Sequence, residues 1–355
     1  MKKTLIAVAA LSAMAASAMA ANVTLYGKLD QGFQVNSVKK DGEDRTTTWK
    51  GASGISSGSR WGLKGTEEIA DGYTVGFVVE SKIDGMDGKG DSSRLFNRDA
   101  FVTLGTPFGS LTVGRTGMLS DGCTGDIVSG PASPFGTTYG IAAATTTSFV
   151  GLGETRTDRA VRYVSPKFAG VQFHAEYANM TYKVLAKKPE FTGQKADKAG
   201  DTASTKKRYG GVGVSYANGP FYAAVAAETI RQANGDLDAL ADNPQIYSIA
   251  ANYNFGVAKV FGGYQYAKDS KWGGDKLNAG TLGVSAPVAG GTLMASIAYA
   301  KGDKEDRKLT TGAIGYKYSL SKRTYVYTDL AYAEDKKTDE KTKTTQFNLG
   351  LCHNF

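Results

Sequence analysis

Alternation along strand-like runs of the chain places five basic residues on one face, opposite the apolar residues: Lys28, Arg60, Lys64, Arg98 and Arg162. A long segment between two such runs, residues 118–155, carries three acids and no base: Asp121, Asp126 and Glu154. Fixed charges of this kind make and break no bonds. Facing each other across a narrow passage, they create an electric field that sorts ions by sign. We therefore expect these residues to act electrostatically.

The residues that usually carry catalysis or bind metals are few. The two histidines, His174 and His353, have no metal-binding spacing to each other or to the two cysteines, Cys123 and Cys352. No nucleophile–base motif and no glycine pattern for a phosphate is found, and two cysteines are too few for a disulfide framework. We expect no metal, no cofactor and no enzymatic activity. Whether the two cysteines are bonded stays open.

The elements that would position these charges are short strands. In the first run, Val23, Leu25 and Leu29 fall on one face and Lys28 on the other. Runs of about ten residues that alternate between apolar and polar, separated by turns, are typical of transmembrane β-barrel strands. Sixteen such runs can be marked: 22–35, 58–66, 72–83, 96–106, 109–117, 158–166, 168–180, 207–217, 219–231, 244–255, 256–269, 276–287, 291–302, 308–319, 322–334 and 343–355.

The connections between these runs alternate between short and long. An even number of strands, with short turns at one end and long loops at the other, indicates a closed antiparallel barrel, whose short turns face the periplasm. The 118–157 connection is unusual for its length, and loops this long are mostly functional or disordered. It carries large apolar residues such as Phe135 and Tyr139, so we expect an ordered loop.

The first twenty residues have the layout of a secretory signal peptide: Lys2 and Lys3, then an apolar run, then small residues ending at Ala20. We expect residues 1–20 to be cleaved and 21–355 to form one barrel domain. No later window has the ~18 consecutive apolar residues of a membrane helix. The formal net charge is +8, but export separates the chain from nucleic acid, so we expect no nucleic-acid partner.

Several stretches, in order along nearly the whole mature chain, resemble the general trimeric porins of the Gram-negative outer membrane, especially the β-proteobacterial and neisserial form. The matching stretches are LYGK (25–28), RWGLKGTE (60–67), NRDAFVTL (97–104), FGSLTVGR (108–115), VRYVSPKFAGVQF (161–173) and NLGLCHNF (348–355). Each is weak alone. Together with the signal peptide and the terminal Phe355, they are specific.

The resemblance implies an all-β fold, a 16-stranded antiparallel transmembrane barrel in the outer membrane, assembled as a homotrimer with one water-filled pore per protomer. Residues 118–157 would fold into the lumen as the constriction loop, and Phe355 would be part of the assembly signal. Expected partners are outer-membrane lipid, lipopolysaccharide, and small hydrophilic solutes and ions.

The resemblance also assigns the charges. Lys28, Arg60, Arg98 and Arg162 sit where related porins carry a basic cluster on the barrel wall, and Asp121, Asp126 and Glu154 would lie on the facing loop. Arg60 and Arg98 are taken as mid-strand residues, for which a lipid-facing orientation would cost ~2–4 kcal/mol each. Glu80 and Lys82 could form a separate wall pair. Arg115 is expected near the subunit interface and Arg159 at the rim.

Where relatives have an acidic Pro-Glu-Phe-Gly stretch, this chain has Ser133-Pro134-Phe135-Gly136. With fewer acids on the loop, we expect bases to outnumber acids at the narrowest point and the channel to prefer anions weakly. The leading hypothesis is passive diffusion of small hydrophilic solutes. A substrate-selective channel for small organic anions is the alternative, and a barrel enzyme or an adhesin is a third.

Overall fold

The chain forms a sheet of long antiparallel strands in the computed structural model, which describes residues 23–120, 123–143, 155–185, 202–233, 243–270 and 274–355. The described residues contain two short 3₁₀ turns, η1 (Gly140–Ala142) and η3 (Lys304–Asp306). They also contain seventeen strands: β1 (Thr24–Lys40), β2 (Thr46–Ser53), β3 (Arg60–Ala70), β4 (Tyr73–Lys82), β5 (Ala100–Thr106), β6 (Gly109–Gly117), β7 (Arg156–Val164), β8 (Val171–Leu185), β9 (Thr202–Asn218), β10 (Phe221–Ala233), β11 (Gln245–Asn254), β12 (Lys259–Ser270), β13 (Gly274–Val288), β14 (Gly291–Gly302), β15 (Lys308–Ser319), β16 (Thr324–Lys336) and β17 (Lys341–Asn354).

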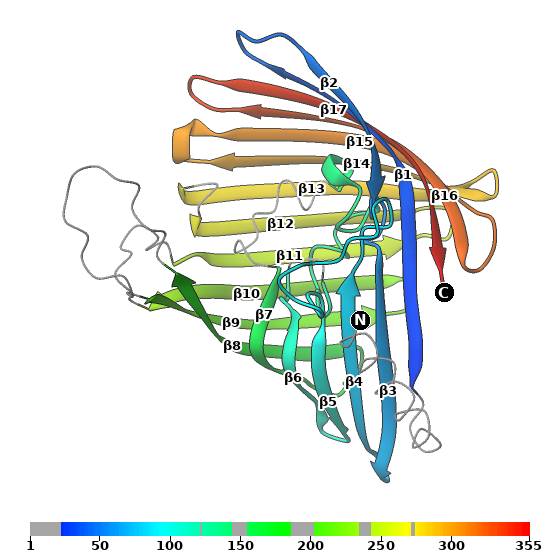
Figure 1. Cartoon of the computed structure of the whole chain (residues 1–355), viewed down its shortest axis with the longest axis vertical. Coiled ribbons are helices and arrows are strands. Elements are labelled where there is room, and N and C mark those ends of the chain that lie inside the picture. Colours follow the sequence, from blue (N-terminus) through cyan, green and yellow to red (C-terminus); the bar gives the residue numbers. More distant parts are fainter. Residues whose placement is uncertain (1–22, 121–122, 144–154, 186–201, 234–242, 271–273) are drawn as a thin grey trace, which may run out of the picture.

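The sheet closes on itself because β1 pairs with β17, the last strand. Both β2 and β3 pair with the same edge of β1: β2 along Gln31–Val38 and β3 along Thr24–Lys28. They are therefore two parts of one barrel strand, interrupted at residues 54–59. The described strands occupy sixteen positions in the ring, as the sequence predicts, and every pairing between them is antiparallel. Figure 1 shows neighbouring strands of the sheet side by side.

The first hairpin is longer than the sequence indicates. Residues 36–57 are predicted as a loop, but β1 continues to Lys40 and β2 returns from Thr46. This part of the hairpin is rich in Thr, Ser and Lys and mostly exposed. It therefore lacks the apolar face by which a strand is recognised in a sequence.

The two faces of the strands differ as a membrane barrel requires. Along β1, Leu25 and Phe33 are 60% and 68% exposed, whereas Asp30 is fully buried. The same alternation recurs around the ring, where the exposed positions are Leu, Val, Ile, Phe and Tyr. This outward apolar surface suits hydrocarbon, and the polar side chains point inward. None of the helices in the described ranges is both long and apolar enough to cross a bilayer.

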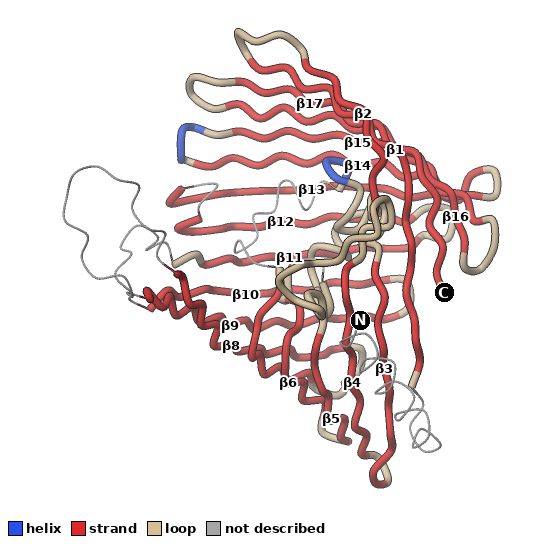
Figure 2. The backbone as a smooth tube through the Cα atoms, viewed as in Figure 1, coloured by secondary structure: helices blue, strands red, loops and turns tan. Residues whose placement is uncertain are grey.

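Among its described residues, the connection between β6 and β7 contains one short helix, η1, and is otherwise drawn as loop in Figure 2. Its described residues contact inward-facing side chains of β10, β11 and β14. Tyr222 of β10 donates to the Ile127 carbonyl (2.8 Å), Asn252 of β11 to the Pro131 carbonyl (2.9 Å), and Ser296 of β14 to the Ala142 carbonyl (3.2 Å). Leu119, Ile127 and Val128 pack into the same hydrophobic cluster as alanines of the barrel wall.

The ring is completed at the C-terminus. Phe355 and Gly27 exchange two backbone hydrogen bonds, of 3.0 and 3.1 Å. The Phe355 ring lies over Gly27, where a Cβ would touch that ring and lie 2.6 Å from the Arg60 carbonyl oxygen. Glycine at 27 therefore allows the last aromatic residue to pack on the first strand.

We predict that Gly27→Val destabilises the folded barrel by ~1–3 kcal/mol, because the new side chain has no space and the backbone must shift. Gly210→Ala on β9 is the matched control, since a Cβ there meets nothing within 4 Å. The measurement is the urea midpoint of the electrophoretic mobility shift between folded and unfolded protein. Equal midpoints for Gly27→Val and wild type would contradict this account of the closure.

Candidate functional site

Glu80 of β4 is the centre of a charged cluster on the inward face of the barrel. Its carboxylate accepts from Arg60 Nε (3.1 Å), from Arg98 Nε and from the Tyr26 hydroxyl (3.1 Å). Glu80 is only 5% exposed, whereas the arginine side chains retain about a fifth of their accessible surface. The two guanidinium groups therefore remain in contact with water while the carboxylate that orients them is covered.

Lys28 belongs to the same face, because it is the register partner of Arg60 across the β1–β3 pair. Its amine donates to Ser57 Oγ at 3.0 Å. A second carboxylate, Asp30, lies behind this group and is fully buried. It accepts from the backbone amides of Ser56 (2.6 Å) and Ser57 (2.7 Å) and from the Tyr327 hydroxyl (2.5 Å). The segment 54–59 is thus tied to the barrel wall next to Lys28.

The mid-strand placement predicted for Arg98 is wrong, and Arg60 is mid-strand only in the joined barrel strand of β2 and β3. Arg60 is the first residue of β3, and Arg98 precedes β5. Their inward orientation follows from their contacts with Glu80, not from the cost of charge in lipid. Glu80 bonds to these arginines, not to Lys82 as a separate wall pair.

Lys64 lies on the same face of β3 as Arg60, but it is closer to the short turn that follows β3 and is exposed. Its amine sits 5.2 Å from the centre of the Tyr26 ring. Tyr26 thus joins Lys64 to the Glu80 cluster, and Lys64 lies at the edge of the site.

Arg162 has different surroundings from the other four bases. The residue is 6% exposed, and its guanidinium donates to Glu176 of β8, with Nε at 2.7 Å from Oε2. It also donates to the carbonyls of Thr124 (2.9 Å) and Gly117. The charge is therefore neutralised at the base of the β6–β7 connection, where it holds the start of that connection against the wall.

The acids expected on the loop divide into two groups. Asp121 and Glu154 lie outside the described residues. Asp126 accepts from the backbone amides of Val128 (3.0 Å), Ser129 (2.8 Å) and Gly130 (2.6 Å). Its carboxylate therefore shapes a turn of the connection itself.

Thr138 and Tyr139 of the β6–β7 connection contact the segment 54–59, which lies beside Lys28. The Tyr139 amide donates to the Ile55 carbonyl at 2.5 Å, and Thr138 Oγ1 donates to the Ser56 carbonyl. The Tyr139 ring packs edge-on against Phe135 and Tyr327, with centroids 5.5 and 5.4 Å apart. Burial raises the pKa of Tyr139 well above its usual value, so its hydroxyl stays neutral.

Comparison with known proteins decides the family. The family model for Gram-negative porins matches residues 7–338. The chain belongs to this family. An outer membrane porin protein of Bordetella pertussis is 30% identical, with both chains covered completely, and outer membrane porin protein 32 of Delftia acidovorans is 34% identical over 95% of this chain and 90% of its own.

A solved structure described as an anion-selective porin from Comamonas acidovorans superposes with a TM-score of 0.68 at 27% identity. The match covers 94% of this chain and all of that one. The protein is therefore an outer-membrane porin, a channel whose barrel encloses a path for ions and small hydrophilic solutes. Its relatives are channel proteins, not enzymes.

Several residues of the site escape sequence reasoning. The porin uses Glu176 and Glu228 to hold its β6–β7 connection: Glu228 accepts from the Leu119 amide at 3.0 Å, and Glu176 from Arg162. Asp99 binds Arg156 at 3.1 Å and also Thr124. The sequence feature that could have pointed to these residues is an acidic residue at an inward position of a strand, since a buried carboxylate needs a partner.

Cys123 and Cys352 form no disulfide. Cys352 of β17 is buried and is the register partner of Asp30 of β1, and Cys123 lies next to Gly117 at the base of the β6–β7 connection. Arg115 shares the Asp158 carboxylate with Arg94, at 2.6 and 2.7 Å, and Arg159 is exposed. Within the described residues, no group of three or more His, Cys, Asp or Glu side chains is arranged to hold a metal ion.

Proposed function

We propose that this porin conducts ions and small hydrophilic solutes by passive diffusion, with a weak preference for anions set by Lys28, Arg60 and Arg98. The observation that carries the proposal is the charge balance of the group formed by Lys28, Arg60, Arg98, Glu80 and Asp30, which we call the wall cluster. Three bases face two carboxylates, Glu80 and Asp30, and both carboxylates are at least 95% buried. A permeating ion therefore meets amines and guanidinium groups before it meets carboxylates.

The narrow part of the pore is proposed to lie between this cluster and the connection 118–157. The contacts of Thr138 and Tyr139 with the segment 54–59 support this position, because that segment also holds Lys28. Charge close to a narrow path raises the local concentration of the opposite ion. Water in the pore screens the field over ~8–10 Å at moderate salt, so the preference stays weak.

The loop acids have a smaller part in this proposal than the bases. The Asp126 carboxylate accepts hydrogen bonds from the backbone amides of residues 128–130. Less negative charge is therefore left to oppose the basic wall. Asp121 and Glu154 remain candidates for the acidic side. The anion preference of the Comamonas porin, which has a similar fold at 27% identity, agrees with a basic wall.

The alternative is a selective channel for small organic anions, and solute flux separates it from general diffusion. In liposomes containing the purified porin, we expect swelling rates for neutral sugars to fall smoothly with solute size. Small carboxylates should permeate faster than cations of equal size. Carboxylate flux that saturates at millimolar concentration while sugars are excluded would favour the selective channel instead.

Assembly and export complete the proposal. We infer a homotrimer of residues 21–355, cleavage of residues 1–20, and a role for Phe355 in recognition by the assembly machinery. The mass of the detergent-solubilised protein tests the first point, and a single-protomer mass would contradict it. N-terminal sequencing of the mature protein should begin at Ala21.

A further inference from the structure

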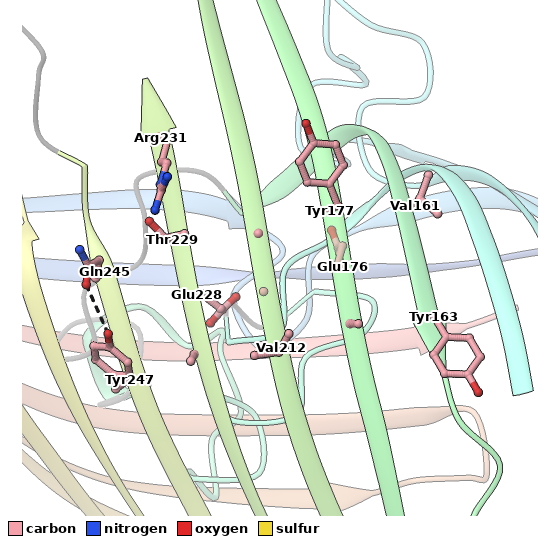
Figure 3. Close-up of a pocket in the computed structure, with 14 residues that line it drawn as sticks. Val161, Tyr163, Glu176, Tyr177, Val212, Glu228, Thr229, Arg231, Gln245 and Tyr247 are labelled. Atoms are coloured by element: carbon pink, nitrogen blue, oxygen red, sulfur yellow. Dashed lines mark hydrogen bonds between the residues drawn. The ribbon is translucent and has the colours of Figure 1, made fainter. Parts of the chain in front are cut away.

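The connection between β6 and β7 is attached to the barrel wall in more than one place. Near its start the attachment uses carboxylates: Glu228 of β10 accepts from the Leu119 amide at 3.0 Å, and Glu176 of β8 binds Arg162, which donates to the Gly117 carbonyl. Figure 3 shows both carboxylates. A second attachment lies further along the connection, at η1, and is made by neutral amide side chains.

Four amide side chains of β1 and β17 form a closed ring of hydrogen bonds on the inward face. Gln34 Nε2 donates to Asn348 Oδ1 (3.0 Å), and Asn348 Nδ2 donates to Gln346 Oε1 (3.3 Å). Gln346 Nε2 donates to Asn36 Oδ1 (2.8 Å), and Asn36 Nδ2 donates to Gln34 Oε1 (3.1 Å). All four bonds run in the same direction around the ring, so they polarise one another and the loss of one weakens the rest. We call these four residues the amide ring.

The amide ring contacts η1 through Gln346. The Gln346 Oε1 atom also accepts from the Ile141 amide at 3.2 Å, and the residue is 6% exposed. A Cβ at Gly140 would lie 2.3 Å from the same oxygen, so glycine is needed for this close approach. Because Gln346 Nε2 is bound to Asn36, the oxygen of the same amide group is held toward Ile141.

The turn that the amide ring holds is strained. Tyr139 and Gly140 both have positive φ, 70° and 60°. A left-handed backbone is unfavourable for a bulky aromatic residue, so Tyr139 depends on surrounding contacts to stay in it. The wall lies on one side of this turn, since Gln346 and Tyr327 are inward-facing residues of β17 and β16. A turn released from these contacts can therefore move only toward the lumen.

We propose that the amide ring is a latch that holds η1 against the wall and keeps the path through the barrel open. Gln346 contacts η1, and Gln34, Asn36 and Asn348 are positioning residues that act through it. This inference rests on the proposed function, because η1 must border the conducting path. The amide ring and the wall cluster then have separate tasks. The charges set which ion is preferred, and the neutral amides keep the passage open.

Single-channel recordings of two variants test the latch. Gln346→Met keeps the side-chain volume but removes the contact with Ile141, so brief closures should be about tenfold more frequent than in wild type. Within the described part of the chain, the Gln34 side chain hydrogen-bonds only to members of the ring. Gln34→Met should nevertheless give about fivefold more closures, because it opens the ring. Gln172→Met is the matched control, since Gln172 donates to the Ser165 carbonyl at 3.2 Å near a short turn.

Gln34→Glu separates hydrogen bonding from packing. A protonated carboxyl group can donate to Asn348 and accept from Asn36, as the amide does, whereas an ionised one has no proton to donate. Closures should match wild type at about pH 4 and match Gln34→Met at about pH 9. Asp329, which accepts from Asn348 at 2.8 Å, is present in both proteins, so each comparison is made with wild type at the same pH.

Hydrogen exchange of the Ile141 amide is a second measurement, and it does not depend on conduction. In detergent-solubilised porin we expect exchange to be about tenfold faster in Gln346→Met and about fivefold faster in Gln34→Met. Closures and exchange equal to wild type in Gln34→Met would overturn the amide ring as a unit. Larger, steady conductance in both variants would overturn the inward direction of movement. If wild type formed no channels, the task of keeping a path open would fall with the proposed function, whereas faster exchange in both variants would still support the attachment of η1.

Discussion

Replacing Arg60 and Arg98 by glutamine is expected to convert the weak anion preference into a cation preference. The wall cluster then changes from three bases and two carboxylates to one base and two carboxylates. A unit charge about 8 Å from a permeating ion in water contributes ~0.5 kcal/mol. Two charges, acting oppositely on chloride and potassium, would change their ratio by ~2 kcal/mol, which screening reduces to about 1 kcal/mol or roughly fivefold.

Glu80→Gln is the matched variant that makes the cluster more positive instead of more negative. It removes the covered carboxylate and leaves both guanidinium groups, so the anion preference should increase. Reversal potentials of the two variants should therefore move to opposite sides of the wild-type value. Arg231→Gln, a charge change on the outer face, is the control and should not move the potential. If the double arginine variant keeps the wild-type value, these arginines do not set selectivity.

Arg162→Ala is expected to have the largest effect on stability. It leaves Glu176 buried without its cation and leaves the Gly117 and Thr124 carbonyls without their donor. Removing one partner of a buried ion pair typically costs ~3–5 kcal/mol. The urea midpoint should fall, and single-channel recordings should become noisier, because the β6–β7 connection loses its attachment beside β7.

The double variant Arg162→Met/Glu176→Leu is the control for this attachment. It removes both charges and keeps apolar volume, so it should recover part of the stability lost in Arg162→Ala. The reversal potential also separates two roles for Arg162. An attachment residue changes stability and leaves selectivity nearly unchanged. Unchanged stability with a shift as large as that of the Arg60/Arg98 variant would instead place Arg162 among the charges that act on ions.

Much of the fold follows from the sequence, because residues along each strand of a membrane barrel alternate between the lumen face and the lipid face. The alternation locates the runs 291–302 and 308–319 with the bounds found for β14 and β15. It fails at 36–57, where both faces of the hairpin are polar. The sequence also predicts that Lys28, Arg60 and Arg98 face inward, and the structure brings them together around Glu80.

The partners of these charges are harder to predict, since they depend on contacts between residues far apart in the chain. Arg162 has the same alternation phase as Lys28, yet it meets Glu176 and two carbonyls of the β6–β7 connection. Asp126 was expected to face the pore, but its carboxylate is taken by backbone amides two to four residues away. Periodicity indicates which face a side chain lies on. It does not show whether a neighbour neutralises its charge.

The most direct test of anion preference is the reversal potential of the wild-type porin in a planar bilayer under a tenfold KCl gradient. The net basic wall formed by Lys28, Arg60 and Arg98 predicts a potential on the chloride side of zero, well short of the value for ideal chloride selectivity. A potential on the potassium side would contradict the proposed role of this cluster.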